Sequence, residues 1–324
     1  MTELTFRDAI RQAMIEEMTH NPNVLMMGED IALYGGSFQV TRGLLDQFGP
    51  DRVIDTPISE SGFVGAAVGA AVMGLSPVVE LQFADFLPIA MDQLINSAAK
   101  MRWTHGGQAT VPLVIRLPFG AGRTTGVHHS QSPEAWCMNV PGLKIVMPST
   151  PADAKGLLKT SIRDPNPVLY FENKLLYGTK GEVPDGEYFV PLGKAEVKRQ
   201  GSDVTIVALG LMVREALNAA KQLEETGIEA EVVDPRTIRP LDIETIVTSV
   251  KKTTRLVIVH EAPSFGGVGA EIAAQVSCEA FGYLDAPIIR VTAPETPVPF
   301  SPALERLYLP DASRIIAAVR GLGL

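Results

Sequence analysis

Glu60 is the side chain whose type and surroundings point most directly to chemistry. It stands in the run Thr56-Pro57-Ile58-Ser59-Glu60-Ser61 and leads directly into a stretch of Gly and Ala residues. A carboxylate at the start of a helix can simply complement the positive end of the helix dipole, and Ser59 or Ser61 can cap the helix. The residues that follow favour a second interpretation, in which Glu60 lies beside a cleft.

Small residues form one face of the helix expected after Glu60. They recur at three- and four-residue spacing and are Gly62, Gly65, Ala66, Gly69, Ala70 and Gly74. Such a face lets another backbone come very close, and each Gly inside a helix costs roughly 0.5–1 kcal/mol relative to Ala. We therefore expect a tight helix contact, within the fold or between chains, that places Glu60 beside a cleft. The apolar run that ends at Leu75 is too short for a bilayer, which takes about 20 residues to cross.

A Gly-rich loop from Phe119 to Ser132 carries the next candidates, His128 and His129. Loops of this kind beyond strand ends are where α/β sheets bind ligands, and Gly28 to Arg42 forms another. Histidine can exchange protons near neutral pH or donate to a developing oxyanion, so the pair is a candidate for catalysis. The alternative is that both histidines are simply solvated polar residues. A metal site is disfavoured because no third ligand is spaced nearby.

Other motifs carry less information. Gln82-Phe83-Ala84-Asp85-Phe86 follows an expected strand, and its aromatic residues can belong to the core or to a cofactor platform. Gly266-Gly267-Val268-Gly269 is similar to a dinucleotide loop, but Ile272 replaces the third Gly, so we interpret it as a helix start. The sequence has neither a Gly-x-Ser-x-Gly elbow nor a phosphate loop with Gly-Lys-Ser/Thr, which disfavours the commonest hydrolases and nucleotidases.

Strands and helices alternate along the chain and predict two doubly wound α/β domains with mostly parallel sheets. In the first half, strands are expected at 23–27, 77–81, 112–117, 144–146 and 168–172, and helices at 5–18, 61–74, 85–104 and 151–163. In the second half, strands are expected at 204–209, 229–233, 256–260 and 287–291, and helices at 213–226, 241–251 and 269–281. The segment between Leu175 and Lys194 is rich in Gly, Pro and charge, so we expect domains at 1–190 and 191–324.

Composition narrows the class of protein. The net charge of −9 and the pI near 5.2 argue against nonspecific nucleic-acid binding, which requires clustered Lys and Arg. Cys137 and Cys278 lie far apart and fit neither a disulfide framework nor a zinc site. The N-terminus begins without a basic or apolar signal stretch, so we expect a cytoplasmic protein that does not associate with membranes. A processed organellar protein would look the same.

Taken together, these segments resemble the beta chain of the thiamine-diphosphate-dependent 2-oxoacid dehydrogenases, the decarboxylating first component of the pyruvate, branched-chain and acetoin complexes. The resemblance runs essentially end to end. Its most specific pieces are Gly28-Glu29-Asp30, Asp55-Thr56-Pro57-Ile58-Ser59-Glu60, Asp92-Gln93-Leu94-Ile95-Asn96, His129-Ser130-Gln131-Ser132, Pro141-Gly142-Leu143-Lys144 and Asp153-Ala154-Lys155-Gly156-Leu157-Leu158. It implies a transketolase-like pyrimidine-binding domain followed by a transketolase-like C-terminal domain.

The resemblance also implies roles for site residues. Glu60 matches the carboxylate that hydrogen-bonds a ring nitrogen of the cofactor's aminopyrimidine and favours its imino tautomer, which can take the proton of the thiazolium carbon. Phe86 matches the aromatic residue that packs on the pyrimidine, and Gln82 matches a neighbour in the same pocket. His129 matches the loop histidine that faces the substrate and the lipoyl group, whereas His128 is one residue away from the family position.

A structural potassium site is a further implication. The family's pattern maps onto Leu113, Ser161, Ile162, Asp164 and Asn166, with mostly backbone carbonyls as ligands. Oxygen ligands in a turn suit a hard cation. An Asx turn that closes a helix is the alternative for this segment.

One absence defines the expected partner. Thiamine enzymes usually hold the diphosphate through magnesium and a Gly-Asp-Gly motif, and this sequence has none. The resemblance therefore implies a separate alpha chain that supplies the diphosphate half with Mg²⁺, in an assembly of two alpha and two beta chains. It also implies docking on a dihydrolipoyl acyltransferase core through the C-terminal domain, including Asp285-Ala286-Pro287.

The expected reaction is oxidative decarboxylation of a 2-oxoacid with transfer of the acyl group to lipoyl-lysine. The run from His129 to Ala135 is similar to the branched-chain type, and the run from Ala293 to Pro302 to the pyruvate and acetoin types. We favour pyruvate, although Cys137-Met138-Asn139 departs from the His that often precedes Pro-Gly-Leu-Lys. Two rival interpretations are a noncatalytic subunit that braces an alpha chain and docks it on the core, and a one-chain enzyme of the transketolase type.

Overall fold

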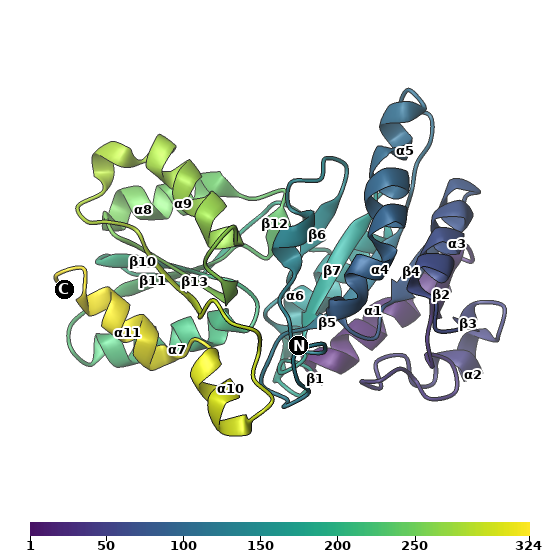
Figure 1. Cartoon of the computed structure of the whole chain (residues 1–324), viewed down its shortest axis with the longest axis horizontal. Helices are drawn as coiled ribbons and strands as arrows, with labels where there is room; N and C mark the ends of the chain where they lie inside the picture. The colour runs from purple at the N-terminus through teal and green to yellow at the C-terminus, as the bar shows by residue number, and fades with distance from the viewer. The chain divides into compact units, whose positions relative to one another are not determined.

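The computed structural model describes residues 1–324, and the chain divides into two compact units (Figure 1). The first unit comprises Met1–Phe119 and Trp136–Leu192, and the second comprises Gly120–Ala135 and Gly193–Leu324. The Gly-rich loop that carries His128 and His129 therefore belongs to the second unit, although its flanking residues belong to the first.

A parallel sheet forms the centre of the first unit. Its strands lie in the order β6-β7-β5-β4-β2-β3, and every neighbouring pair is parallel. Their bounds are β2 Val24–Gly28, β3 Val53–Asp55, β4 Ser76–Glu80, β5 Val114–Phe119, β6 Lys144–Val146 and β7 Val168–Asn173. All residues of β5 and β7 are buried, as expected for strands covered on both faces.

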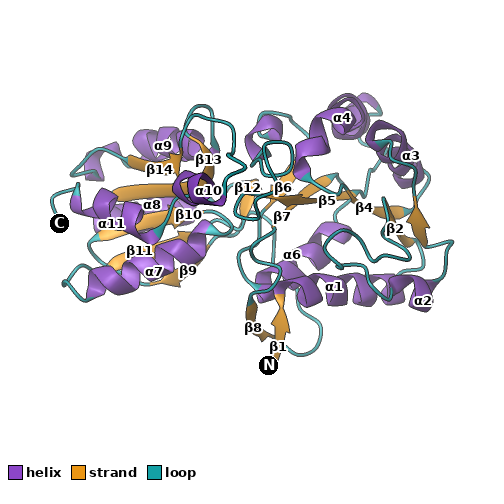
Figure 2. Cartoon of the chain, turned by 60° about the horizontal axis from the view of Figure 1, so that its bottom comes forward, coloured by secondary structure: helices purple, strands orange, loops and turns teal.

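Helices cover both faces of this sheet. Figure 2 shows α1 and α6 on one face and α3 and α4 on the other. The helices are α1 Phe6–His20, α2 Leu44–Phe48, α3 Glu60–Val72, α4 Leu87–Asp92, α5 Ala99–Thr104 and α6 Pro151–Ile162, with a π-helical stretch at Gln93–Ala98. Thr5 and Thr150 cap α1 and α6 by accepting hydrogen bonds from Asp8 N and Asp153 N.

The second unit repeats this plan on a smaller sheet. Its strand order is β14-β13-β10-β11-β9, and all neighbours are parallel except the β11–β9 pair. The elements of this unit are β9 Glu196–Arg199, β10 Val204–Ala208, α7 Met212–Glu224, β11 Ala230–Asp234, β12 Thr237–Arg239, α8 Ile243–Thr253, β13 Leu256–Pro263, α9 Val268–Glu279, β14 Ile289–Ala293, α10 Pro302–Tyr308 and α11 Ala312–Arg320. Helix α7 packs with α11, and α8 packs with α9.

These observations confirm the expected fold class of two doubly wound α/β domains with mostly parallel sheets. The structure adds a small antiparallel sheet of β1 (Thr2–Thr5) and β8 (Lys180–Val183). None of the helices combines the length and the apolar character needed to cross a membrane.

Candidate active site

Three neighbouring strands of the first unit end at the same edge of the sheet. Gly28, the last residue of β2, pairs with Asp55 of β3 on one side and with Glu80 of β4 on the other. Because these strands are parallel, the residues that follow each of them emerge together. The edge therefore gathers Glu29, the segment from Thr56 to Glu60, and the segment from Leu81 to Phe86.

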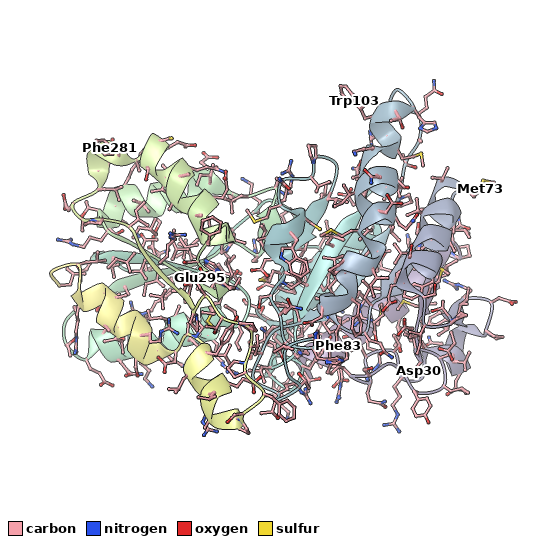
Figure 3. All side chains as sticks on the ribbon, in the orientation of Figure 1. Asp30, Met73, Phe83, Trp103, Phe281 and Glu295 are labelled. Atoms are coloured by element: carbon pink, nitrogen blue, oxygen red, sulfur yellow. The ribbon has the colours of Figure 1, made fainter.

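Figure 3 illustrates this placement. Asp30 and Phe83 lie toward one end of the first unit, whereas Met73 and Trp103, at the far ends of α3 and α5, lie toward the opposite end. Both Met73 and Trp103 are more than four-fifths exposed, with relative exposures of 84% and 89%.

Glu60 is the first residue of α3 and is 6% exposed. Ser59 occupies the N-cap position, but its side chain makes no capping hydrogen bond. The Glu60 carboxyl itself has no hydrogen bond or ion-pair partner, so it is a buried acceptor at the positive end of a helix. This position leaves it available to a ligand that can donate a hydrogen bond.

Only part of the small-residue face of α3 packs against another segment of this chain. A Cβ at Gly65 would lie 3.2 Å from Gln93 Oε1, so α3 and the π-helical stretch approach closely there. A Cβ at Gly69 or Gly74 would meet nothing within 4 Å. The expected tight contact is thus formed inside the fold at Gly65 and leaves Gly69 open.

Glu29 is a site residue to which the sequence analysis gave no role. It is 4% exposed, and its Oε1 atom has no hydrogen-bond partner. Burial, reinforced by the charges of Glu60 and Asp30, raises the pKa of Glu29 to about 7. The sequence feature that could have identified Glu29 is its position directly after a buried strand. That strand ends at the same sheet edge as Glu60.

The loop after Glu29 is fixed in place over this edge. Ala32 N donates to Asp55 Oδ1 at 2.8 Å, and Thr41 Oγ1 donates to Ile31 O at 2.7 Å. Gly36 adopts φ +77°, and a Cβ there would lie 2.6 Å from Glu80 Oε1. Only Gly fits this close approach of the loop to the end of β4.

A buried ionic triad supports the strands beneath the site. Arg116 of β5 donates to Glu80 of β4 and to both carboxyl oxygens of Glu172 of β7, the latter at 2.7 Å. All three side chains are at most 1% exposed. Burial opposes the charge of Arg116, but the two carboxylates outweigh burial and raise its pKa. Breaking this triad would leave uncompensated charge in the core.

Gln82 and Phe86 follow β4 and are both half-buried. The Phe83 and Phe86 rings pack edge to face with centroids 5.9 Å apart, and Phe38 packs on Phe83 at 5.6 Å. Lys174 Nζ lies 5.2 Å from the Phe83 ring centre. These rings form a partly exposed aromatic wall at the site edge rather than part of the closed core. Glu60, Gln82 and Phe86 thus all follow strands that end at the same edge of the sheet.

His128 and His129 lie in the second unit. His128 is exposed and His129 is half-buried. His129 N donates to Gly126 O at 3.3 Å, and Thr125 Oγ1 donates to His129 O at 3.1 Å. The loop is therefore closed on itself by its own hydrogen bonds rather than extended into solvent.

Four residues of the expected potassium pattern lie at the end of α6 or in the turn after it, and Leu113 directly precedes β5. Asp164 Oδ1 accepts hydrogen bonds from Asn166 N and Asn166 Nδ2 at 2.9 and 3.0 Å, which is an Asx turn after α6. Lys144 forms an ion pair with Asp164, and Leu113 O accepts from Val168 N at 2.8 Å. Ser161 O accepts from Asp164 N, and Ile162 ends α6.

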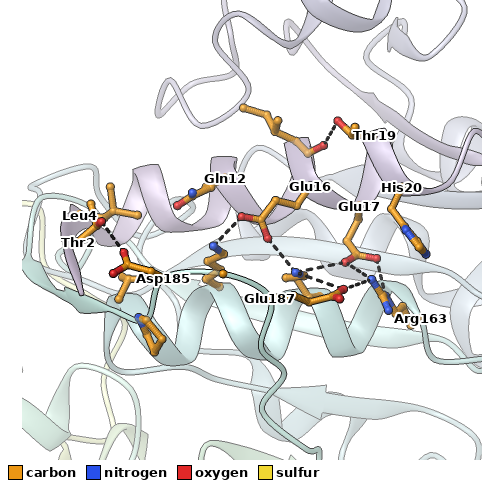
Figure 4. Close-up of a pocket in the computed structure, with 16 residues that line it drawn as sticks. Thr2, Leu4, Gln12, Glu16, Glu17, Thr19, His20, Arg163, Asp185 and Glu187 are labelled. Carbon is orange, nitrogen blue, oxygen red and sulfur yellow. Dashed lines mark hydrogen bonds and ion pairs between the residues drawn. The ribbon is translucent and has the colours of Figure 1, made fainter.

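A hollow of about 490 Å³ lies between α1 and α6 (Figure 4). Its charged residues neutralise one another: Lys155 and Lys159 bind Glu16 at 2.6 and 2.8 Å, and Arg163 binds Glu17 at 2.8 Å. The charged groups there are already paired, so the hollow offers less to a reacting group than the site around Glu60.

Comparisons with known proteins identify both domains of the chain. Residues 2–180 match the transketolase pyrimidine-binding domain, and residues 193–315 match the transketolase C-terminal domain. A solved structure described as a split-gene transketolase in an inactive beta4 tetramer superimposes with a TM-score of 0.80 at 27% identity, covering 98% of each chain.

Three relatives that match nearly all of this chain identify its family more specifically. The pyruvate dehydrogenase E1 component subunit beta of Rhizobium meliloti (strain 1021) is 50% identical, covering 99% of this chain and 70% of the relative. That of Rickettsia felis is 51% identical, covering 98% of both chains. The acetoin:2,6-dichlorophenolindophenol oxidoreductase subunit beta of Bacillus subtilis (strain 168) is 49% identical, covering 97% of this chain and 95% of the relative.

The comparisons confirm the resemblance inferred from the sequence motifs. The pyrimidine-binding match spans the three strand ends that gather Glu29, Glu60 and Phe86. On this basis, the chain belongs to the family of E1 beta subunits of the 2-oxoacid and acetoin dehydrogenases.

Proposed function

We propose that this chain binds the pyrimidine half of thiamine diphosphate and, together with an alpha chain, catalyses oxidative decarboxylation of a 2-oxoacid with acyl transfer to lipoyl-lysine. Pyruvate is the favoured substrate, because two of the relatives named above are pyruvate dehydrogenase subunits. The observation that carries the proposal is the buried, unpartnered carboxyl of Glu60 beside Glu29 at one sheet edge.

The residues present fit such a group. Glu60 and the orphaned Oε1 of Glu29 are buried acceptors that a nitrogen-rich ring can satisfy. The half-buried Phe86, packed against Phe83, presents an aromatic surface to a flat ring. Gln82, on the same segment, adds an amide that can both donate and accept.

When bound, the cofactor supplies a thiazolium carbon that adds to the 2-oxoacid and holds the electron pair released with CO₂. Glu60, which is 6% exposed, would hold a proton at the ring nitrogen of the aminopyrimidine. Glu29, whose pKa is about 7, takes up a proton near neutral pH and so limits the negative charge beside Glu60.

His129 acts in the transfer step. As the disulfide bond of the lipoyl ring opens, one sulfur takes the acyl carbon and the other requires a proton, which His129 donates. The half-buried position of His129 in a loop closed by Thr125 suits a group that must be held but also meet a large acceptor.

The alpha chain supplies the diphosphate half of the site with Mg²⁺, because the sequence lacks Gly-Asp-Gly. In support, the similar split-gene transketolase structure is described as an inactive beta4 tetramer. Two alpha and two beta chains form the assembly. Leu113, Ser161, Ile162, Asp164 and Asn166 would hold K⁺, which would add to the hydrogen bonds of the turn after α6.

The acyltransferase core docks on the second unit near Asp285. A hollow of about 590 Å³ is lined there by α9, Phe281 and the segment from Leu284 to Ile288, and Phe281 is 79% exposed. An apolar side chain on a partner could fill this hollow.

Coexpression with an alpha chain tests the proposal. The complex, but not this chain alone, should reduce a dye acceptor with pyruvate in preference to branched 2-oxoacids and acetoin. Preference for acetoin would support the second candidate, which the Bacillus subtilis relative favours. Glu60→Ala distinguishes a catalytic subunit from one that only braces the alpha chain. Full activity in the variant complex would support the noncatalytic assembly subunit.

A further inference from the structure

We propose that Glu305, on α10 of the second unit, is a positioning residue that clamps the His129 loop for acyl transfer. This inference rests on the role proposed above for His129. It concerns a residue far from the loop in sequence, because 181 positions separate Glu305 from Thr124.

The clamp consists of two hydrogen bonds from the loop backbone to one carboxylate. Glu305 Oε1 accepts from Gly122 N at 2.7 Å, and Oε2 accepts from Thr124 N at 2.9 Å. Glu305 is only 2% exposed, and both bonds are partly buried. Hydrogen bonds from backbone amides to an ionised acceptor are about twice as strong as neutral ones.

The loop backbone is shaped to receive this carboxylate. Gly122 and Thr124 have φ values of +97° and +53°, and Thr124 is one of few non-Gly residues in the left-handed region. Left-handed residues in a turn can aim successive amide groups at the same side and form a nest for an anion. Here the anion is a side chain of the same unit, held at a fixed place by α10.

Glu261 extends the clamp toward the start of the loop. This residue of β13 is 5% exposed, and its Oε1 accepts from Ala121 N at 2.5 Å. Three amides of the loop, those of Ala121, Gly122 and Thr124, are therefore bound by two carboxylates of the second unit.

The clamped segment is connected to His129 through a short path. Thr125, directly after Thr124, bonds to His129 O at 3.1 Å and to Ser130 Oγ at 3.0 Å. Phe300 limits the space beside the loop, since a Cβ at Gly126 would lie 3.2 Å from its ring. Releasing Gly122 and Thr124 should therefore loosen the segment that places His129, while leaving Glu60 of the first unit intact.

The consequence is specific to one step. Pyruvate decarboxylation with a dye acceptor does not require the proton that His129 donates, whereas transfer to the lipoyl group does. Loss of the clamp should lower kcat for lipoyl acylation with little change in KM for the 2-oxoacid.

The test uses the complex with the alpha chain and Glu305→Gln, which keeps the side-chain shape but removes the charge. Asp242→Asn is the matched control, because Asp242 is also a buried carboxylate of the second unit that accepts two backbone amides, from Ala195 at 3.0 Å and Thr245 at 3.3 Å. Both variants are compared by melting temperature, so that a general loss of folding is recognised.

Two readouts are combined. Amide hydrogen exchange of the peptide that covers 120–126 should quicken about tenfold in Glu305→Gln and remain unchanged in Asp242→Asn. Lipoyl acylation should fall about tenfold in Glu305→Gln while dye reduction stays within about twofold, and Glu305→Gln should add little to His129→Ala.

Unchanged exchange in Glu305→Gln, or an equal loss of both activities, would overturn the proposal. Faster exchange with normal lipoyl acylation would also overturn it, because the clamp would then not position His129. If the wild-type complex acts on none of the 2-oxoacids, the proposed function fails, and faster exchange would still support the clamp itself.

Discussion

Glu29 and Glu60 lie at the same edge of the sheet of the first unit, close enough to interact electrostatically. The charge of Glu60 adds to burial in raising the pKa of Glu29 to about 7. Two acids at one edge of a parallel sheet, one of them with a pKa raised by burial, are suited to holding and exchanging a proton.

This relationship predicts a pH dependence for Glu29→Gln. The folded-state pKa of Glu29 is raised from 4.5 to about 7, so stability is fully present below about 4.5 and decreases as pH rises toward and through 7. The substitution should flatten the pH dependence of the unfolding free energy over this window. Urea unfolding at pH 5 and pH 8 measures it, with exposed Glu182→Gln as the control; an unchanged slope in Glu29→Gln would contradict the assignment.

A second buried acid predicts a similar effect at higher pH. Burial, with a contribution from Glu261, raises the pKa of Glu134 to about 8, and its Oε2 has no hydrogen-bond partner. Wild-type stability should therefore decrease as pH rises from about 4.5 through 8. Glu134→Gln should be more stable than the wild type at pH 9 by on the order of a few kcal/mol, with little advantage at pH 4.5.

Thermal unfolding across this pH range tests the Glu134 prediction. Exposed Glu279→Gln in the same unit should follow the wild-type profile. A Glu134→Gln profile parallel to that of the wild type would show that Glu134 is ionised in the folded protein at neutral pH.

The ionic triad predicts a large stability loss for Arg116→Met. The substitution would leave Glu80 and Glu172 buried without their cation, which typically costs about 3–5 kcal/mol. Lys180→Met breaks the exposed pair with Glu3 and should cost less than about 1 kcal/mol. Chemical denaturation gives both values, and equal costs would contradict the structural role of the triad.

Substituting Ala at two glycines with similar φ values distinguishes the stability cost of a steric clash from the cost of backbone strain. Gly142 and Gly74 have φ values of +99° and +97°, but a Cβ at Gly142 would lie 2.0 Å from Ala99 O, whereas at Gly74 it would meet nothing within 4 Å. Gly74→Ala should cost about 1 kcal/mol from backbone strain alone. Gly142→Ala should cost several times more, and similar melting temperatures for the two variants would refute the close contact with α5.

Local patterns were sufficient to predict the main sheets, because strands such as β5 and β10 are short apolar runs and helices such as α6 have clear caps. The interpretation of Gly266 to Gly269 as a helix start agrees with α9, which begins at Val268. The structure also gives a physical reason for its glycines. A Cβ at Gly267 or Gly269 would lie 2.7 Å from the buried ring of His260.

Contacts between segments that are distant in sequence could not be predicted from local sequence patterns. The pairing of β1 with β8 joins Thr2 to Val183, and the grouping of Gly120–Ala135 with the second unit depends on Glu261 and Glu305. Glu60, Gln82 and Phe86 stay predictions from their motifs, and the structure places all three after strands that end at one sheet edge. Glu29 became a candidate only when the strand register placed it on the same edge as Glu60.

The most direct test of the central claim is the exchange of the thiazolium C2 proton of thiamine diphosphate for deuterium, followed in the complex of this chain with an alpha chain. At equal cofactor content, Glu60→Gln should slow this exchange by about 100-fold or more, because the buried carboxyl no longer supports proton transfer at the pyrimidine nitrogen. Glu182→Gln should leave it unchanged. Exchange in Glu60→Gln within about twofold of the wild-type rate would contradict the account.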